Sequence, residues 1–238
     1  MATQKIDIKD TITAGVQYGL KNIVNLLLMV ILYVVTVWIP WLNVGTTIGL
    51  FKAVIKIGNG EAVDPKSIFD KENWSNLGDF FLLCGLVSIG ITAAAAFMFI
   101  PAIIIGIAWQ FALYFFIDKG LSPTKCLKVS YKATYGEKWR IFFIYLILYI
   151  AIVIVCAILG IIPKVGPFLA ALATICCAAI VVAVEGVMYK HFSDKADEIF
   201  ADKIEACGCK VAPALEAPAA PAPEAPAAPA PASEAPAE

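Results

Sequence analysis

Residues 120–148 read GLSPTKCLKVSYKATYGEKWRIFFIYLIL, a basic stretch that runs directly into a long apolar one. The basic half belongs to the loop 118–140, which holds six Lys and Arg residues. Short loops rich in Lys and Arg stay on the cytoplasmic side of a membrane protein. The apolar half continues to about residue 162 and is long enough to cross a bilayer. This stretch therefore predicts a membrane span that starts from the cytoplasm.

The composition of the whole chain places it among membrane proteins. Of its 238 residues, 61% are apolar and 16% are charged, and the mean hydropathy is +0.82. A typical soluble domain has about 45–50% apolar and about 25% charged residues. The surplus of apolar side chains exceeds what a water-soluble core of this size could bury. We therefore expect an integral membrane protein with several spans.

Six apolar segments can be drawn along the chain. They cover residues 23–39, 42–57, 80–99, 101–117, 141–162 and 167–189. Taken two by two, the segments are joined by turns that each contain an Ile-Pro pair, at 39–40, 100–101 and 162–163. Proline disfavours a continuous helix because it lacks the backbone N–H. The sequence predicts an all-α bundle of six transmembrane helices in three hairpins. In the alternative, the short segment 42–57 lies in the interface, because it carries Lys52 and Lys56, and five spans remain.

The positions of the basic residues favour six spans over five. With six, the N-terminal segment 1–22, the loops 58–79 and 118–140 and the C-terminus share the cytoplasmic side. Seventeen of the 18 Lys and Arg residues then lie inside. Five spans would place the two termini on opposite sides. The expected location is the inner membrane, with both termini cytoplasmic.

The regions outside the bundle 23–189 have distinct compositions. Residues 1–22 form an amphipathic segment, and 190–211 are expected to form a short amphipathic helix beside the membrane. Residues 212–238 are almost entirely Ala, Pro and Glu, a composition typical of a disordered tail. Cys207 and Cys209 form a C-x-C pair that lacks the second ligand pair of a zinc site, and acylation is the other reading of this pair.

Glu185 is the acidic residue that lies well inside an expected span. Carboxylates in membrane spans are costly and often belong to a proton or cation pathway. In the alternative interpretation Glu185 is structural and reaches toward the interface near Lys190 and His191. It is the candidate intramembrane polar site of this chain.

The loop before the fifth segment presents a candidate surface for anionic lipid. Lys125, Lys128 and Lys132 recur at helical spacing, and Lys138 and Arg140 follow. A basic helix on the leaflet attracts anionic head groups by about 1 kcal/mol per basic residue. The alternative is that these residues only set the orientation of the protein.

A faint internal repeat links two loops of the chain. Residues 63–81 and 121–143 both begin near a proline, continue as a helical stretch with a glycine and end at Phe-Phe. Residues 8–24 are a candidate third copy. The repeated unit would be one short interfacial helix followed by one hairpin.

The stretch 120–148 resembles a signature found in broad bacterial families of polytopic membrane proteins without known activity. It also resembles the membrane domain attached to some glycerophosphodiester phosphodiesterases. The shared elements are a helix led by proline with a serine, then Gly-x-x-Trp and an aromatic residue at the start of a span. In this chain they are Pro123, Ser130, Gly136, Trp139 and Phe142. The resemblance covers about residues 10–192 and implies the fold; the phosphodiesterase activity is not implied, because no phosphodiesterase domain is recognised in the sequence.

The sequence favours a protein that is not an enzyme and needs no cofactor. It has one histidine, His191, and neither a GxSxG motif nor a phosphate-binding glycine loop. Its lysines are dispersed along a membrane surface, which argues against nucleic acid as a partner. We expect a scaffold or accessory factor that meets anionic lipid through its basic face and a protein partner through its tail. The alternative is a small transporter or lipid-handling protein.

Overall fold

The computed structural model describes residues 5–161 and 165–207, and those residues form helices and no strand. In chain order the helices are α1 (Ile8–Lys21), α2 (Ile23–Thr36), α3 (Pro40–Gly58), η1 (Pro65–Phe69), η2 (Lys71–Trp74), α4 (Leu77–Phe97), α5 (Phe99–Trp109), α6 (Ala112–Lys119), α7 (Pro123–Ala133), α8 (Lys138–Gly160) and α9 (Gly166–Cys207). Two of them, η1 and η2, are short 3-10 helices. The expected all-α class is confirmed.

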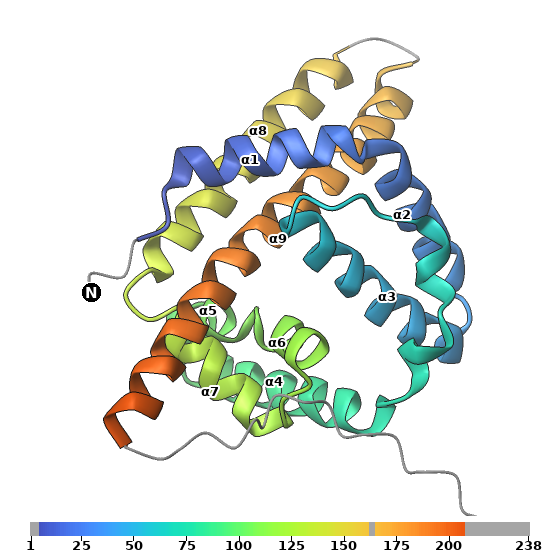
Figure 1. Ribbon diagram of the computed structural model, residues 1–238. Coiled ribbons are helices and arrows are strands. Elements are labelled where there is room, and N and C mark those ends of the chain that lie inside the picture. The colour runs from blue at the N-terminus through green and yellow to red at the C-terminus, as the bar shows by residue number, and fades with distance from the viewer. Residues whose placement is uncertain (1–4, 162–164, 208–238) are drawn as a thin grey trace, which may run out of the picture.

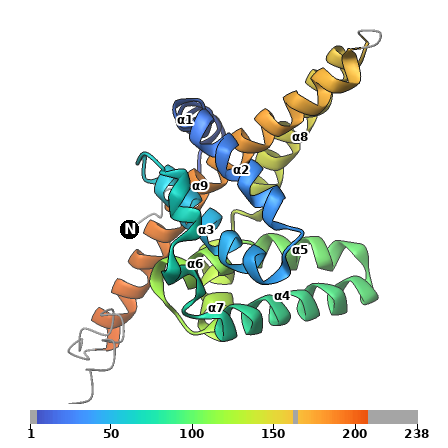
Figure 2. The ribbon, with the colours of Figure 1, turned by 90° about the vertical axis from the view of Figure 1, so that its right-hand side faces the viewer.

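Three helical hairpins extend toward the same side of the molecule, the right-hand side of Figure 2. The paired helices are α2 with α3, α4 with α5, and α8 with α9. A short helical segment precedes each hairpin, namely α1, η1–η2 and α7. These segments lie at the end opposite the hairpin tips (Figures 1 and 2). We call this end, made of α1, η1, η2 and α7, the base.

Four helical stretches among the described residues are long and apolar enough to cross a membrane: Leu77–Phe97, Phe99–Lys119, Lys138–Gly160 and Phe168–Ile199. A fifth is added only if α1 and α2, bent by 81° at Asn22, are counted as one. The six expected spans are therefore not confirmed. α2 alone has 14 residues and reaches about 21 Å, short of the roughly 30 Å hydrocarbon core. α3 has 19 residues but carries Lys52 and Lys56, so its composition is too polar.

The span expected at 101–117 lies within one apolar helical stretch, Phe99–Lys119, that contains a two-residue interruption. α5 ends at Trp109 and α6 starts at Ala112, so the helix is interrupted at Gln110 and Phe111. The break leaves backbone carbonyls without helical partners. The buried Ser130 of α7 donates a hydrogen bond of 2.7 Å from its Oγ to the carbonyl oxygen of Ala108. A helix of the base thus stabilises the broken span.

The three turns agree only in part with the expected Ile-Pro positions. Pro40 is the first residue of α3, and Ile39 before it is extended, as expected. In the second hairpin the turn falls earlier, because Met98 is the extended residue and Pro101 lies within the first turn of α5. Proline is tolerated there because the first N–H groups of a helix have no acceptor. The turn at 162–163 lies outside the described residues.

α9 is longer than the sequence indicated. It runs without interruption over 42 residues, so no separate amphipathic helix begins at residue 190. The segment after Gly186 contains neither glycine nor proline before Cys207, and its Lys, Asp, Glu and Ala residues allow the helix to continue. Of the expected regions, 212–238 and Cys209 lie outside the described residues.

Glycines allow α9 to lie close to two other helices. A Cβ added at Gly58 of α3 would lie 2.2 Å from the carbonyl oxygen of Gly186 of α9. A Cβ added at Gly15 of α1 would lie 2.5 Å from Cγ2 of Val184. Small residues permit such close crossings in membrane proteins. α9 therefore forms the axis around which α1, α3 and α8 pack (Figure 1).

The outer halves of the hairpins are largely uncovered. In the second half of α4, Ile89 is 70% and Phe97 is 86% exposed, and near the end of α8, Ile158 is 61% exposed. The α4–α5 and α8–α9 hairpins diverge from the base, as Figure 2 shows. Surfaces of this kind are stable when lipid covers them, which agrees with a membrane-embedded protein.

Candidate functional site

Glu185 is half-buried on α9, where it meets side chains of two other helices. The phenol groups of Tyr114 on α6 and Tyr145 on α8 lie close enough to interact with its carboxylate. Gln110, between α5 and α6, lies close to Tyr145 in turn. The structure thus brings a carboxylate, two phenols and an amide together beside the broken span.

The surroundings of Glu185 differ from those expected. His191, which the sequence placed near it, faces Glu137, with His191 Nε2 lying 3.6 Å from Glu137 Oε2. The buried Nε2 of Gln110 has no hydrogen-bond partner among the described residues. Phenol hydroxyls can donate to a carboxylate or, when the carboxyl group is protonated, accept from it. The chemistry that this group permits is the uptake of a proton or of a small cation.

A second polar cluster, which the sequence did not predict, surrounds Glu137. Glu137 is 2% exposed, and its carboxylate accepts hydrogen bonds from the backbone N–H of Ile6, at 2.8 Å, and from Lys195 Nζ. Arg140 Nη1 donates to the carbonyl oxygen of Ile6, at 2.6 Å. With His191, these side chains form what we call the Glu137 cluster: Glu137, Arg140, His191 and Lys195.

Charge balance explains why Glu137 can be buried. Burial by itself raises the pKa of a carboxyl group, but the nearby His191 and the hydrogen bonds from Lys195 and Ile6 outweigh it and lower the pKa of Glu137 to about 2. The carboxylate is therefore ionised at neutral pH. Two signals in the sequence could have indicated the cluster: Glu137 is an acid in a basic loop, and His191 and Lys195 lie four positions apart on one helix face.

The five candidate lipid-binding residues lie in different surroundings. Lys125, Lys128 and Lys132 are exposed on α7. Lys138 is half-buried, and its Nζ lies 4.6 Å from the centre of the Tyr131 ring. Arg140 belongs to the Glu137 cluster and holds Ile6 instead of facing outward.

The residues of the 120–148 signature have separate structural roles. Pro123 is the first residue of α7, and Ser130 binds the carbonyl of the broken span. Gly136 has a φ of +83°, which favours glycine and turns the chain from α7 into α8. Trp139 is 74% exposed, and Phe142 follows it one turn later on α8.

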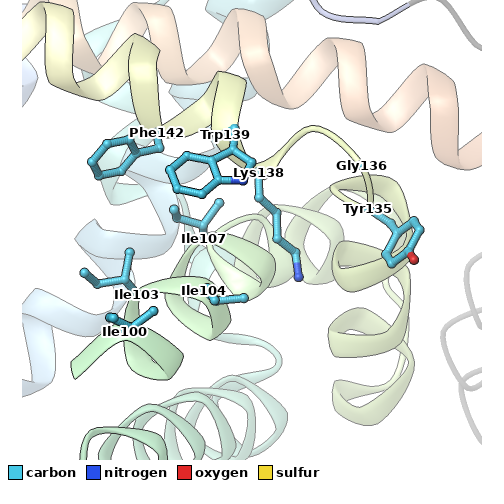
Figure 3. Close-up of a pocket in the computed structure, with 9 residues that line it drawn as sticks. All are labelled: Ile100, Ile103, Ile104, Ile107, Tyr135, Gly136, Lys138, Trp139 and Phe142. Atoms are coloured by element: carbon cyan, nitrogen blue, oxygen red, sulfur yellow. The ribbon is translucent and has the colours of Figure 1, made fainter. Parts of the chain in front are cut away.

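A pocket of about 460 Å³ lies between α5 and the start of α8 (Figure 3). It is lined by Ile100, Ile103, Ile104, Ile107, Tyr135, Gly136, Lys138, Trp139 and Phe142. Eight of the nine residues are apolar, aromatic or glycine, and Lys138 is the charged one. In Figure 3 the Lys138 side chain extends from α8 into the space between α5 and α7.

Neither the grouping of possible metal ligands nor a comparison with known proteins indicates a function for these residues. Within residues 5–161 and 165–207, no three His, Cys, Asp or Glu side chains are grouped in a way that could hold a metal ion. No protein-family model, curated protein or solved structure matches this chain. The resemblance of residues 120–148 to bacterial membrane-protein families accordingly stays a prediction.

Proposed function

We infer that this protein is a non-enzymatic membrane scaffold or accessory factor that holds its base against the anionic inner leaflet. Both termini and the base lie in the cytoplasm, and the hairpin tips point toward the outer face. The exposed lysines of α7 then meet lipid head groups or a partner protein bound there.

The contact between Ile6 and the Glu137 cluster supports the shared cytoplasmic side in this proposal. It joins the N-terminal segment to the α7–α8 junction and, through Lys195, to the second half of α9. Segments in direct contact cannot lie on opposite faces of a membrane. This supports an even number of crossings, because a five-span arrangement would separate Ile6 from Glu137.

The first hairpin does not affect whether the number of membrane crossings is even. Whether α2 and α3 cross the bilayer or only enter it, the hairpin returns to the side from which it came (Figure 2). The basic loop 118–140 then lies inside under the positive-inside rule. The lysines of 1–22 and of α7 share that side.

Site-directed labelling tests the orientation. Single cysteines replace Lys9, Lys128 and Phe97, each exposed, in a background without native cysteines. A membrane-impermeant maleimide should modify Phe97→Cys on intact cells, and Lys9→Cys and Lys128→Cys only after permeabilisation. Labelling of Lys128→Cys on intact cells, or of Lys9 and Lys128 from different sides, would overturn the proposal.

The second candidate function is proton-coupled or cation transport, and the group around Glu185 favours it. Broken helices with polar groups at membrane depth recur in the binding sites of transporters. Glu185, Tyr114 and Tyr145 meet beside such a break. In contrast to a scaffold, a transporter should move an ion across a sealed membrane.

Proteoliposomes that contain a pH-sensitive dye distinguish the two functions. A scaffold should give no proton flux above that of empty liposomes under an imposed potential. A transporter should give a flux that Glu185→Gln abolishes and that the exposed control Glu198→Gln, on the same helix, leaves intact. A flux that depends on Glu185 would replace the scaffold by the second candidate.

A further inference from the structure

The pocket beside Trp139 has two unlike ends. Ile100, Ile103, Ile104 and Ile107 recur at helical spacing and present one apolar wall of α5. Trp139 and Phe142 of α8 face this wall (Figure 3). From Ile100 to Ile107 the wall extends about 10 Å along the helix. This part of the pocket suits a hydrocarbon chain.

The other end of the pocket carries a positive charge. Lys138 is the charged residue of the lining, and no acidic residue contributes to it. The ammonium group is held over the Tyr131 ring, 4.6 Å from its centre. α8 begins at Lys138, so the positive end of its helix dipole points to the same place. An anion is the complementary group for this end.

The residues that line the pocket indicate which class of molecule it could bind. Sites for soluble ligands combine apolar walls with several placed polar groups. This pocket offers one cation above an isoleucine wall, so it provides few groups to recognise a polar metabolite. A purely apolar partner helix would leave the ammonium without a counter-charge. A molecule with an anionic head and a hydrocarbon chain fits both ends.

We propose that this pocket is a binding site for one anionic phospholipid of the inner leaflet. The phosphate lies at Lys138, and one acyl chain lies along the α5 wall between Ile100 and Ile107. The exposed indole of Trp139 stands at the boundary between head group and chain, where tryptophan is enriched. The site rests on the orientation proposed above, which puts Lys138 at the inner leaflet.

Fluorescence quenching by brominated lipids tests the site on the full-length protein in detergent micelles. Bromine on the acyl chain quenches a nearby indole, and the part of the quenching lost with Trp139→Phe reports on this pocket. The Trp139-dependent quenching should reach its midpoint at a mole fraction of brominated phosphatidylglycerol about fivefold lower than the mole fraction of brominated phosphatidylcholine that it requires. The factor corresponds to about 1 kcal/mol for one basic residue at an anionic surface.

Three variants identify the group responsible. Lys138→Gln should remove the preference for phosphatidylglycerol, and Lys138→Arg should keep it. Lys190→Gln removes the same charge from an exposed position of α9 outside the pocket and should leave the preference unchanged. An equal loss in Lys190→Gln would show a general surface charge effect and would overturn the site.

The wild-type protein can also refute the site. If the two brominated lipids give the same quenching curve, Trp139 is only in ordinary contact with bulk lipid. This failure is distinct from a failure of the proposed orientation. If the curves coincide while Lys128→Cys is labelled only after permeabilisation, the pocket is wrong and the orientation stands. If Lys128→Cys is labelled on intact cells, the pocket faces the outer leaflet and both proposals fail.

Discussion

Glu137 illustrates how one buried carboxylate can fix three segments that are far apart in the chain. Its partners come from the N-terminal segment, at Ile6, and from α9, at His191 and Lys195. Removing one partner of a buried charge leaves the others unpaired, which costs more than the pair contributes. Glu137 and Arg140 together therefore tie the N-terminal segment to the α7–α8 junction.

Glu137→Gln should destabilise the protein by about 3 kcal/mol at neutral pH, because the amide keeps the shape but loses the charge that Lys195 requires. The thermal midpoint of the detergent-solubilised protein measures the effect. The control is Glu72→Gln, because Glu72 also binds a lysine, Lys52, but its side chain is 80% exposed. That control should change the stability by less than about 1 kcal/mol. Equal effects of the two substitutions would contradict the role of burial.

The lowered pKa of Glu137 predicts a dependence of stability on pH. The pKa falls from an ordinary value of 4.5 to about 2 on folding, so the contribution is complete above pH 4.5. It should decline as the pH falls from 4.5 through about 2, where the folded carboxylate gains its proton. The difference in unfolding free energy between the wild type and Glu137→Gln should shrink over that window. A difference that stays constant down to pH 2 would show that ionisation of Glu137 is not the cause.

The sequence allowed Glu185 to be identified but not its neighbours. A carboxylate within an apolar run is visible from the local sequence. Tyr114 and Tyr145 are distant in the chain and become its partners only through the packing of α6, α8 and α9. For the same reason Arg140 was expected to face lipid, although it binds the backbone of Ile6.

Among the helices, the broken span depends on a helix of the base. Ser130 on α7 and Thr134, the residue directly after this helix, are both fully buried, and their hydroxyl groups donate to the carbonyl of Ala108. The break lies beside the group around Glu185, so α7 also positions that group indirectly. The serine of the 120–148 signature thus has a structural explanation.

Ser130→Ala should destabilise the protein by about 1–3 kcal/mol, because the buried carbonyl of Ala108 loses its closer donor. Ser122→Ala is the matched control: Ser122 is exposed, and its side chain makes no capping hydrogen bond at the start of α7. Thermal unfolding in detergent should separate the two variants. Equal midpoints would indicate that Thr134 or water replaces the lost donor.

The crossing of α3 and α9 gives a steric prediction. Gly58→Ala should cost about 1–3 kcal/mol or more, because the added methyl group would lie 2.2 Å from the carbonyl oxygen of Gly186. Gly85→Ala places the same methyl group on α4, where no atom lies within 4 Å. Its effect should stay within about 1 kcal/mol. Unfolding midpoints compare the two, and a neutral Gly58→Ala would refute the close crossing.

The all-α character of the chain could be predicted from the sequence, whereas the positions of the helix ends were less predictable. Apolar length located α4 and α8 to within a few residues, because lipid requires an intact helix there. The break in α5–α6 has no local signal in Gln110 and Phe111, since Ser130 compensates for it from another segment. The bend at Asn22 accompanies the packing of α1 on the distant α9, whereas the continuation of α9 past residue 190 is compatible with its local composition.

As a whole, the molecule consists of hairpins that are joined at the base and diverge from it. α4 packs on α5, and α8 packs on α9, whereas contact between α4 and α8 is marginal at most. The number of spans could not be predicted from charge and hydropathy alone. A hairpin such as α2–α3 preserves the sidedness of the lysines whether or not it crosses the bilayer.

Spin labels should detect this divergence. A pair at Phe97 and Ile158, near the ends of α4 and α8, should give a broad distance distribution, because no direct packing fixes the two tips. A pair at Lys128 and Glu198, on exposed positions of α7 and α9 at the base, should give a narrow one, since α7 and α9 are packed together there. Pulsed electron–electron spin resonance in nanodiscs measures both. A narrow distribution at the tips would mean that the outer halves of the hairpins are joined.

The length of α9 has a mechanical consequence for whatever follows it. Ala196 of α9 is buried, and the helix continues from there to Cys207. At 1.5 Å per residue this projection measures about 16 Å, twice the Debye length of about 8 Å at physiological salt. With the base at the inner leaflet, as proposed, the last turn of α9 would lie beyond the distance over which the negative charge of the lipid surface acts at physiological salt.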